Sequence, residues 1–148
     1  MAKRWGWLVA GLLPLVALAA TPAQEKAFVD AYKQAYESKD AKGLHALLYT
    51  KGADPQALEF YKMMTTDGMG GKIGSIALEP LSADDKAKAT AAMPGPGGKS
   101  FRLTLAPVKK LVIKRTTKDA SGSSSSTSQV FVAEADGKLV IPVPGPAK

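Results

Sequence analysis

The sequence predicts an α+β domain in which N-terminal helices pack against a curved antiparallel sheet. Two observations lead to this prediction. Apolar residues recur at helical spacing early in the chain, whereas apolar and polar residues alternate in its second half, as they do in half-buried strands. Helices followed by consecutive strands are typical of α+β domains. The chain has 148 residues and no internal repeat, which suits a single domain.

Residues 1–19 have the features of a signal peptide. Lys3 and Arg4 form a basic start, an apolar stretch follows, and small residues lead up to a cleavage site after Ala19. We therefore expect an exported protein, periplasmic or secreted, whose mature domain is 20–148. The apolar stretch is shorter than the ~20 residues of a typical span, so we expect no stable membrane span after cleavage. An uncleaved anchor is the alternative.

Three helices are expected before residue 70. The first spans 24–38, because its apolar side chains recur at three- and four-residue steps: Ala27, Phe28, Ala31, Tyr32 and Ala35. Asp40 is a suitable N-cap for a second, Leu-rich helix from Ala41 to about Tyr49. Asp54 and Pro55 supply the N-cap and first position of a third helix. Its inward side chains are expected to be Leu58, Tyr61 and Met63 or Met64.

Strands dominate the rest of the chain. Alternation predicts strands at 72–79, 101–105, 110–117, 129–135 and 138–143. Between the first two, Ser82 and Asp85 form a variant capping box for a short helix ending near Ala92. Asp136-Gly137 predicts a two-residue hairpin turn. Ser- and Gly-rich composition predicts a flexible loop at 119–128, and three prolines predict a frayed C-terminal tail at 142–148.

Several of these segments resemble the nuclear-transport-factor-2-like, or cystatin-like cone, superfamily. Residues 28–32 resemble the long first helix of the family, residues 37–41 its polar turn and residues 44–48 its short Leu-rich helix. Residues 130–141 are similar to its closing hairpin. The chain is also similar to small exported bacterial proteins of this superfamily whose role is uncharacterised. The resemblance implies a sheet wrapped around the first helix, leaving a conical cavity. On that basis the candidate cavity-lining residues are Phe28, Tyr32, Tyr36, Leu47, Tyr61, Phe101 and Leu103.

The superfamily contains both enzymes and binding modules, so the fold does not choose between them. Enzymes of the isomerase or cyclase type use a carboxylate, His or Tyr in the cavity as base or oxyanion donor. The candidates here are Tyr32, Tyr36, His45, Tyr49, Asp54, Tyr61 and Asp67. Each also has a structural interpretation: Asp40 and Asp54 suit helix caps, the tyrosines suit the core, and His45 is expected to face solvent. No catalytic pair is assigned.

The composition excludes several kinds of site. There is no Cys and one His, which removes thiol chemistry, disulfides and His-rich metal sites. The segment Gly97-Gly98-Lys99-Ser100 ends like a phosphate loop, but Met93 stands where that motif needs its first Gly, and a strand follows instead of a helix. We therefore expect no cofactor and no metal.

The net charge of +7 is local rather than global. Removal of the leader leaves 18 basic and 13 acidic side chains, and residues 99–118 hold seven basic residues and no acidic one. Candidate contacts with an anionic envelope component are Lys109, Lys110, Lys114 and Arg115. A solvated face that guards a sheet edge is the alternative, which we favour. Nucleic acid is not expected, because no basic motif interleaved with aromatic residues is present.

The leading functional hypothesis is therefore a non-enzymatic binding or envelope-associated module with a cone cavity. Its ligand is expected to be a small apolar molecule or an anionic envelope component. The alternative is an isomerase- or cyclase-like enzyme that uses the cavity, and a homodimer formed through the open sheet is a third possibility.

Overall fold

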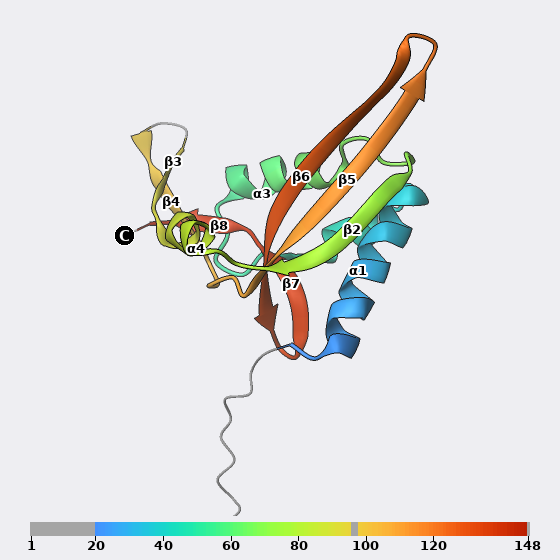
Figure 1. Ribbon diagram of the computed structural model, residues 1–148. Helices are drawn as coiled ribbons and strands as arrows, with labels where there is room; N and C mark the ends of the chain where they lie inside the picture. The colour runs from blue at the N-terminus through green and yellow to red at the C-terminus, as the bar shows by residue number, and fades with distance from the viewer. Residues whose placement is uncertain (1–19, 96–97, 148) are drawn as a thin grey trace, which may run out of the picture.

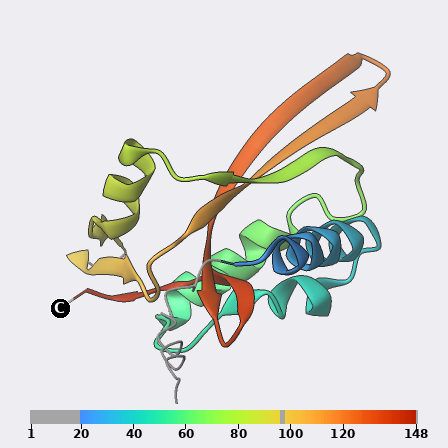
Figure 2. The same cartoon turned by 60° about the horizontal axis from the view of Figure 1, so that its bottom comes forward.

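The computed structural model describes residues 20–95 and 98–147. Three helices cover one face of a curved sheet (Figures 1 and 2): α1 (Pro22–Glu37), α2 (Ala41–His45) and α3 (Pro55–Thr66). Helices α2 and α3 begin where their predicted caps place them, whereas α1 begins at Pro22, two residues before the predicted start at residue 24. Thr21 forms a capping box with Gln24, the carboxylate of Asp40 accepts from the amide of Gly43, and that of Asp54 from two amides in the first turn of α3. The predicted α+β class is confirmed.

The main sheet has five strands in the order β1-β7-β6-β5-β2. Their bounds are β1 (Leu48–Tyr49), β2 (Ile73–Pro80), β5 (Lys109–Asp119), β6 (Gly122–Ala135) and β7 (Lys138–Pro142). All neighbours are antiparallel except β1 and β7, which are parallel, so the sheet is mixed rather than purely antiparallel. The second helix is accordingly shorter than expected. It ends at His45 because Leu48 and Tyr49 pair with Ile141 and Pro142 instead of continuing the helix.

A smaller sheet corrects the expectation of a frayed tail. Its order is β3-β4-β8, formed by β3 (Met93–Pro94), β4 (Ser100–Leu103) and β8 (Pro144–Pro146). The short helix α4 (Ala83–Thr90), which has the expected Ser82–Asp85 capping box, lies near it (Figure 1). Residues 142–145 are buried. Their prolines lack N–H donors but keep carbonyl acceptors, so the segment adds to a sheet edge instead of fraying.

The core lies between α1 and the sheet. The buried side chains of α1 are Phe28, Tyr32, Ala35 and Tyr36, whereas Ala27 and Ala31 are exposed, so the apolar stripe is rotated from the expected one toward Tyr36. Across from it, β5 and β7 contribute Leu111, Ile113 and Ile141, all essentially inaccessible. The large aromatic side chains decide which face of the helix is buried, because they remove more apolar area from water than alanines do.

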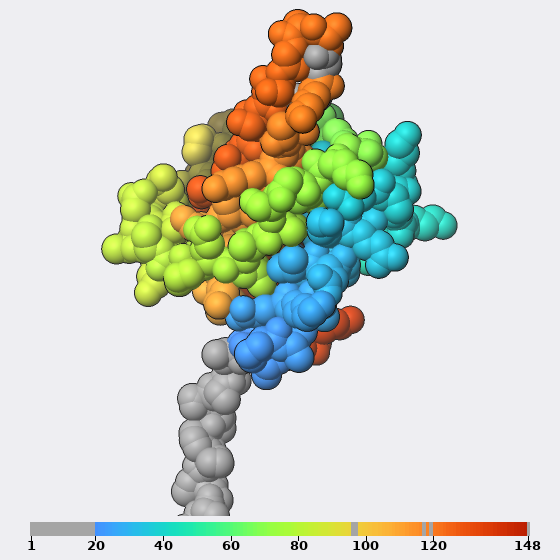
Figure 3. Space-filling view, turned by 45° about the vertical axis from the view of Figure 1, so that its right-hand side comes forward, coloured from blue at the N-terminus to red at the C-terminus, as the bar shows by residue number. Residues whose placement is uncertain are grey.

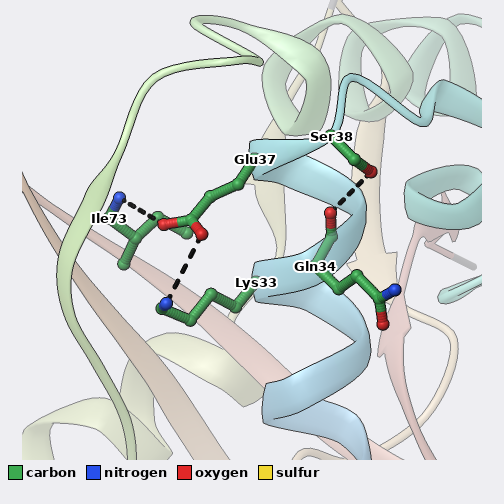
Figure 4. Close-up of polar contacts among 5 residues, drawn as sticks. All are labelled: Lys33, Gln34, Glu37, Ser38 and Ile73. Carbon is green, nitrogen blue, oxygen red and sulfur yellow. Dashed lines mark hydrogen bonds and ion pairs between the residues drawn. The ribbon is translucent and has the colours of Figure 1, made fainter.

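A bulge adjusts β2 to this core. Strict alternation would place Ile73 and Ile76 on opposite faces, but the register shifts between Ile73 and Ser75, at Gly74, and Ile73, Ile76 and Leu78 all pack on the core. The start of β2 is tied to α1 through Glu37. Its carboxylate accepts a hydrogen bond of 3.0 Å from the Ile73 N–H and pairs with Lys33 at 3.4 Å. Both contacts are drawn in Figure 4.

The hairpin of β5 and β6 corrects the expectation of a loop at 119–128. Its arms stay paired from Lys109 with Val132 to Asp119 with Gly122, so residues 122–128 are strand. β2 borders β5 only as far as Arg115, and beyond that residue the hairpin continues as a two-stranded ribbon clear of the body (Figures 2 and 3). Within the described residues no helix is long and apolar enough to cross a membrane.

Candidate functional site

The base of this ribbon forms one wall of an opening between the helices and the sheet, which we call the mouth. Two adjoining pockets occupy it, and both are lined by Arg115 and Asp67. The polar pocket, of about 430 Å³, is further lined by Tyr36, Gly68, Gly71, Lys72, Thr116, Lys118 and Ser126. The second pocket, of about 360 Å³, is further lined by Tyr32, Phe60, Met63, Met64, Thr65, Ile113, Ser128, Gln129 and Val130.

Arg115 stands at the junction of the two pockets. It follows Leu111 and Ile113 on the inward face of β5, and its guanidinium donates to Tyr36 Oη at 2.9 Å and to Ser128 Oγ at 2.5 Å. The guanidinium carbon also lies 5.4 Å from the centre of the Tyr36 ring, within range of a cation–π interaction. No ion pair among the described residues includes Arg115. A half-buried cation is thus held in place by neutral partners.

Two tyrosines of α1 support this arrangement. The rings of Tyr32 and Tyr36 stack, with centres 6.3 Å apart and planes 10° from parallel. Tyr36 Oη donates to the carbonyl of Asp67 at 2.9 Å. Gly68, with φ +76°, allows this approach, because an added Cβ would lie 2.6 Å from that hydroxyl oxygen. Burial raises the pKa of Tyr32 to about 12, although the charge of Arg115 opposes the rise.

The polar pocket carries an excess of positive charge. Lys72, Arg115 and Lys118 line it, and Asp67 is the single carboxylate among its described lining residues. The charge of Lys72 also acts on Glu37, whose pKa is lowered mainly by the hydrogen bond from the Ile73 N–H and secondarily by Lys33 and Lys72. Three cations converging on a concave surface attract an anion, and a guanidinium can bind a carboxylate or phosphate through two parallel hydrogen bonds.

The second pocket exposes apolar side chains of α3. Phe60, Met63 and Met64 line it and are 55%, 64% and 38% exposed. The expectation that Met63 or Met64 faces the core is therefore wrong, since the inward position near the end of α3 is taken by Thr65. The Thr65 hydroxyl donates to the carbonyl of Tyr61, which satisfies its polar atom in that buried position.

The four candidate contacts for an anionic surface are separated by the structure. Lys109 pairs with Glu25 of α1 and Lys110 with Asp85 of α4, each at 2.9 Å. Lys114 is exposed. Arg115, the next residue on the strand, points to the inward face, so the four do not form one basic face.

The candidate cavity-lining residues are likewise dispersed. Tyr32 and Tyr36 lie in the mouth. Phe28 and Leu47 border a separate pocket of about 220 Å³ beside the turn before β7. Tyr61 and Phe101 share a pocket of about 360 Å³ between α3 and the smaller sheet, and Leu103 lines another beside α4. These candidate residues thus border several separate pockets in place of one conical cavity, because core side chains fill the space between α1 and the sheet.

The remaining candidates for catalysis do not assemble around the mouth. Asp54 caps α3, as expected, in the same way that Asp40 caps α2. His45 does not simply face solvent: its Nε2 is buried and has no hydrogen-bond partner among the described residues. No group of three or more potential metal-ligating His, Asp or Glu side chains occurs in the described part of the chain.

Sequence reasoning missed Lys72, Lys118, Phe60 and Ser128 as site residues. One signal was present for the site as a whole: Arg115 is in phase with Leu111 and Ile113, which places a cation on the inward face of a strand. The other residues come from segments that only the tertiary fold brings together, so no local pattern marks them.

Comparison with known proteins does not show a family for this chain. No protein-family model matches the chain, and no curated protein matches it. Among solved structures, one from Campylobacter jejuni described as an NTF2-like transpeptidase superposes with a TM-score of 0.38. It is 13% identical in sequence, and the match covers 79% of this chain and 94% of that one. The class defined by the structure itself is an α+β domain with a cationic mouth between its helices and its sheet.

Proposed function

We propose that this protein is a non-enzymatic binding module whose ligand carries an anionic group, bound in the polar pocket of the mouth. The observation that carries the proposal is Arg115, a cation that hydrogen bonds position at the junction of two pockets and that has no carboxylate partner among the described residues. Because its hydrogen-bond partners are neutral, the charge of Arg115 is not cancelled by them and remains available to an anion.

Binding is favoured over the isomerase- or cyclase-like alternative by the side chains at the mouth. Proton abstraction requires a base whose pKa lies near the working pH and which is within reach of the substrate. The pKa of Tyr32 is about 12, so it stays protonated near neutral pH. Tyr36 is committed to Arg115 and to the Asp67 carbonyl. Asp67, the one carboxylate among the described lining residues, belongs to an exposed residue.

The proposal is tested by titrating the purified protein with acetate and with inorganic phosphate while backbone amide NMR shifts are followed. We expect saturable shifts around Arg115 that weaken steeply with added salt. Lys118→Gln should weaken binding several-fold and Arg115→Gln should nearly abolish it. Lys114→Gln is the matched control, because it removes one exposed charge from the same strand without altering the mouth. Absence of saturable shifts, or equal binding by all three variants, would overturn the proposal.

We also propose that the protein acts outside the cytoplasm after cleavage following Ala19. The first helix begins shortly after this position, with Thr21 as N-cap and Ala20 packed against the core, so such a cut removes none of the described helices and strands. Expression in a bacterial host and N-terminal sequencing of the product test this. A chain starting at Ala20 in the periplasm or medium supports export, and a chain still carrying residues 1–19 in the cytoplasm contradicts it.

A further inference from the structure

Resting on the proposed function, we infer that the ligand is an amphiphilic anion, with its charged head in the polar pocket and an unbranched aliphatic tail in the second pocket, along α3. The two pockets are adjacent and share Arg115 and Asp67. A molecule that spans them therefore passes the guanidinium, which lies where charged head and apolar tail would join.

The head is assigned from the donors that surround the polar pocket. Two of the five N–H groups of Arg115 point to Tyr36 and Ser128, and the others have no acceptor among the described side chains. Lys72 and Lys118 add charge from the same pocket. Flexible ammonium groups flanking a fixed guanidinium favour a compact anion such as a carboxylate, held mainly by Arg115.

The tail is assigned from the exposed apolar side chains. The large hydrophobic side chains that are exposed in the described residues are Phe60, Met63, Met64 and Val108. The first three lie together on α3 and line the second pocket, whereas Val108 lines neither pocket of the mouth. Such clustered exposure marks a site for an apolar partner, and methionine side chains adapt to a flexible alkyl chain.

A small amphiphile fits these features better than a membrane surface. The apolar residues face a pocket that is walled on its other side by Ser128, Gln129 and Val130 of β6. A bilayer presents a broad surface that cannot enter between α3 and β6, whereas a single alkyl chain can. The volume of about 360 Å³ lies within the range of small-molecule sites.

The test is isothermal titration calorimetry of the full chain with butyrate, hexanoate and octanoate, all below the concentrations at which they form micelles. We expect affinity to rise about two- to fourfold for each added methylene, so that octanoate binds at least tenfold more tightly than butyrate. Octanol, which lacks the charge, should bind at least tenfold more weakly than octanoate. Met63→Gln should weaken octanoate binding but not butyrate binding. Val108→Gln, an exposed substitution outside the mouth, should change neither.

The outcomes separate this inference from the proposed function. Equal affinities for butyrate and octanoate, both lost in Arg115→Gln, would leave an anion site and refute the tail. Absence of saturable binding by every carboxylate would refute both. Octanol binding as tightly as octanoate would refute the charged head. Binding to vesicles of anionic phospholipid without binding of monomeric octanoate would show a membrane-contact surface and overturn the inference.

Discussion

Tyr36→Phe tests the polar framework of the mouth, by which we mean the two hydrogen bonds that join the Tyr36 hydroxyl to Arg115 and to the Asp67 carbonyl. It removes the hydroxyl that accepts from Arg115 and donates to the Asp67 carbonyl, while the ring, 2% exposed, stays packed between α1 and the sheet. A hydrogen bond to a charged group contributes about 1.5–3 kcal/mol and a neutral one about 0.5–1.5 kcal/mol. In the variant, water at the open mouth replaces part of the energy of both hydrogen bonds. We therefore expect the free energy of unfolding to fall by about 2 kcal/mol.

Urea denaturation at pH 7, followed by circular dichroism, measures this loss. Tyr49→Phe is the matched control, because the Tyr49 hydroxyl makes no hydrogen bond with the described residues, and we expect a change within about 0.5 kcal/mol. The affinity for acetate should fall several-fold in Tyr36→Phe, since the guanidinium loses its fixed position. If Tyr36→Phe is no less stable than Tyr49→Phe, the framework does not hold Arg115 and the reasoning is wrong.

Three further predictions concern the rest of the domain. Gly145→Ala should lower the free energy of unfolding by about 2–3 kcal/mol in urea denaturation, because the added Cβ would meet the carbonyl oxygen of Gly52 in the loop before α3. Gly74→Ala is the control and should not destabilise the domain in this way, because its added Cβ would make only ordinary van der Waals contacts. The pKa of Asp85 is lowered to about 2 by hydrogen bonds from the backbone of Ser82 and from Lys110. The ionised carboxylate therefore contributes fully to the stability of the fold above pH ~4, and this contribution is lost as the pH falls toward 2. In Asp85→Asn the free energy of unfolding should depend less on pH over that range. Burial raises the pKa of Tyr32 to about 12, so the folded state loses stability relative to the unfolded state as the pH rises from ~10 toward 12. In Tyr32→Phe the free energy of unfolding should fall less steeply over this range of pH, and an unchanged slope would contradict the prediction.

Local chemistry explains which elements could be predicted from the sequence. Capping residues act within three or four positions of their own helix, so Asp40, Asp54 and Ser82 locate helix starts without knowledge of the fold. The Asp136-Gly137 turn is local in the same way, because both residues adopt positive φ, as a type I′ hairpin requires. Each of these features is present in the structure.

Features that depend on distant segments could not be predicted in this way. Leu48 and Tyr49 continue a helical pattern, yet pairing with β7 draws them into a strand. The prolines of β8 indicate an edge, but only the fold provides the partner, β4. The Ser-rich stretch 122–128 has the composition of a loop, and it becomes strand because its neighbour β5 extends that far. In each case a tertiary contact outweighs a weak local preference.

The same distinction explains the change in the candidate site. A run of basic residues along one strand predicts a single charged surface only if their side chains share a face, and successive residues of a strand alternate between faces. Lys110 therefore reaches Asp85 on one side, while Arg115 turns toward Tyr36 on the other. In the proposed function the anion is bound by Arg115, the cation that this alternation places on the inward face of β5 beside Ile113, and its partial burial strengthens the interaction with an anion. A charged residue at a strand position that alternation assigns to the buried, apolar face is thus a sharper indicator of a site than the density of charge along the chain.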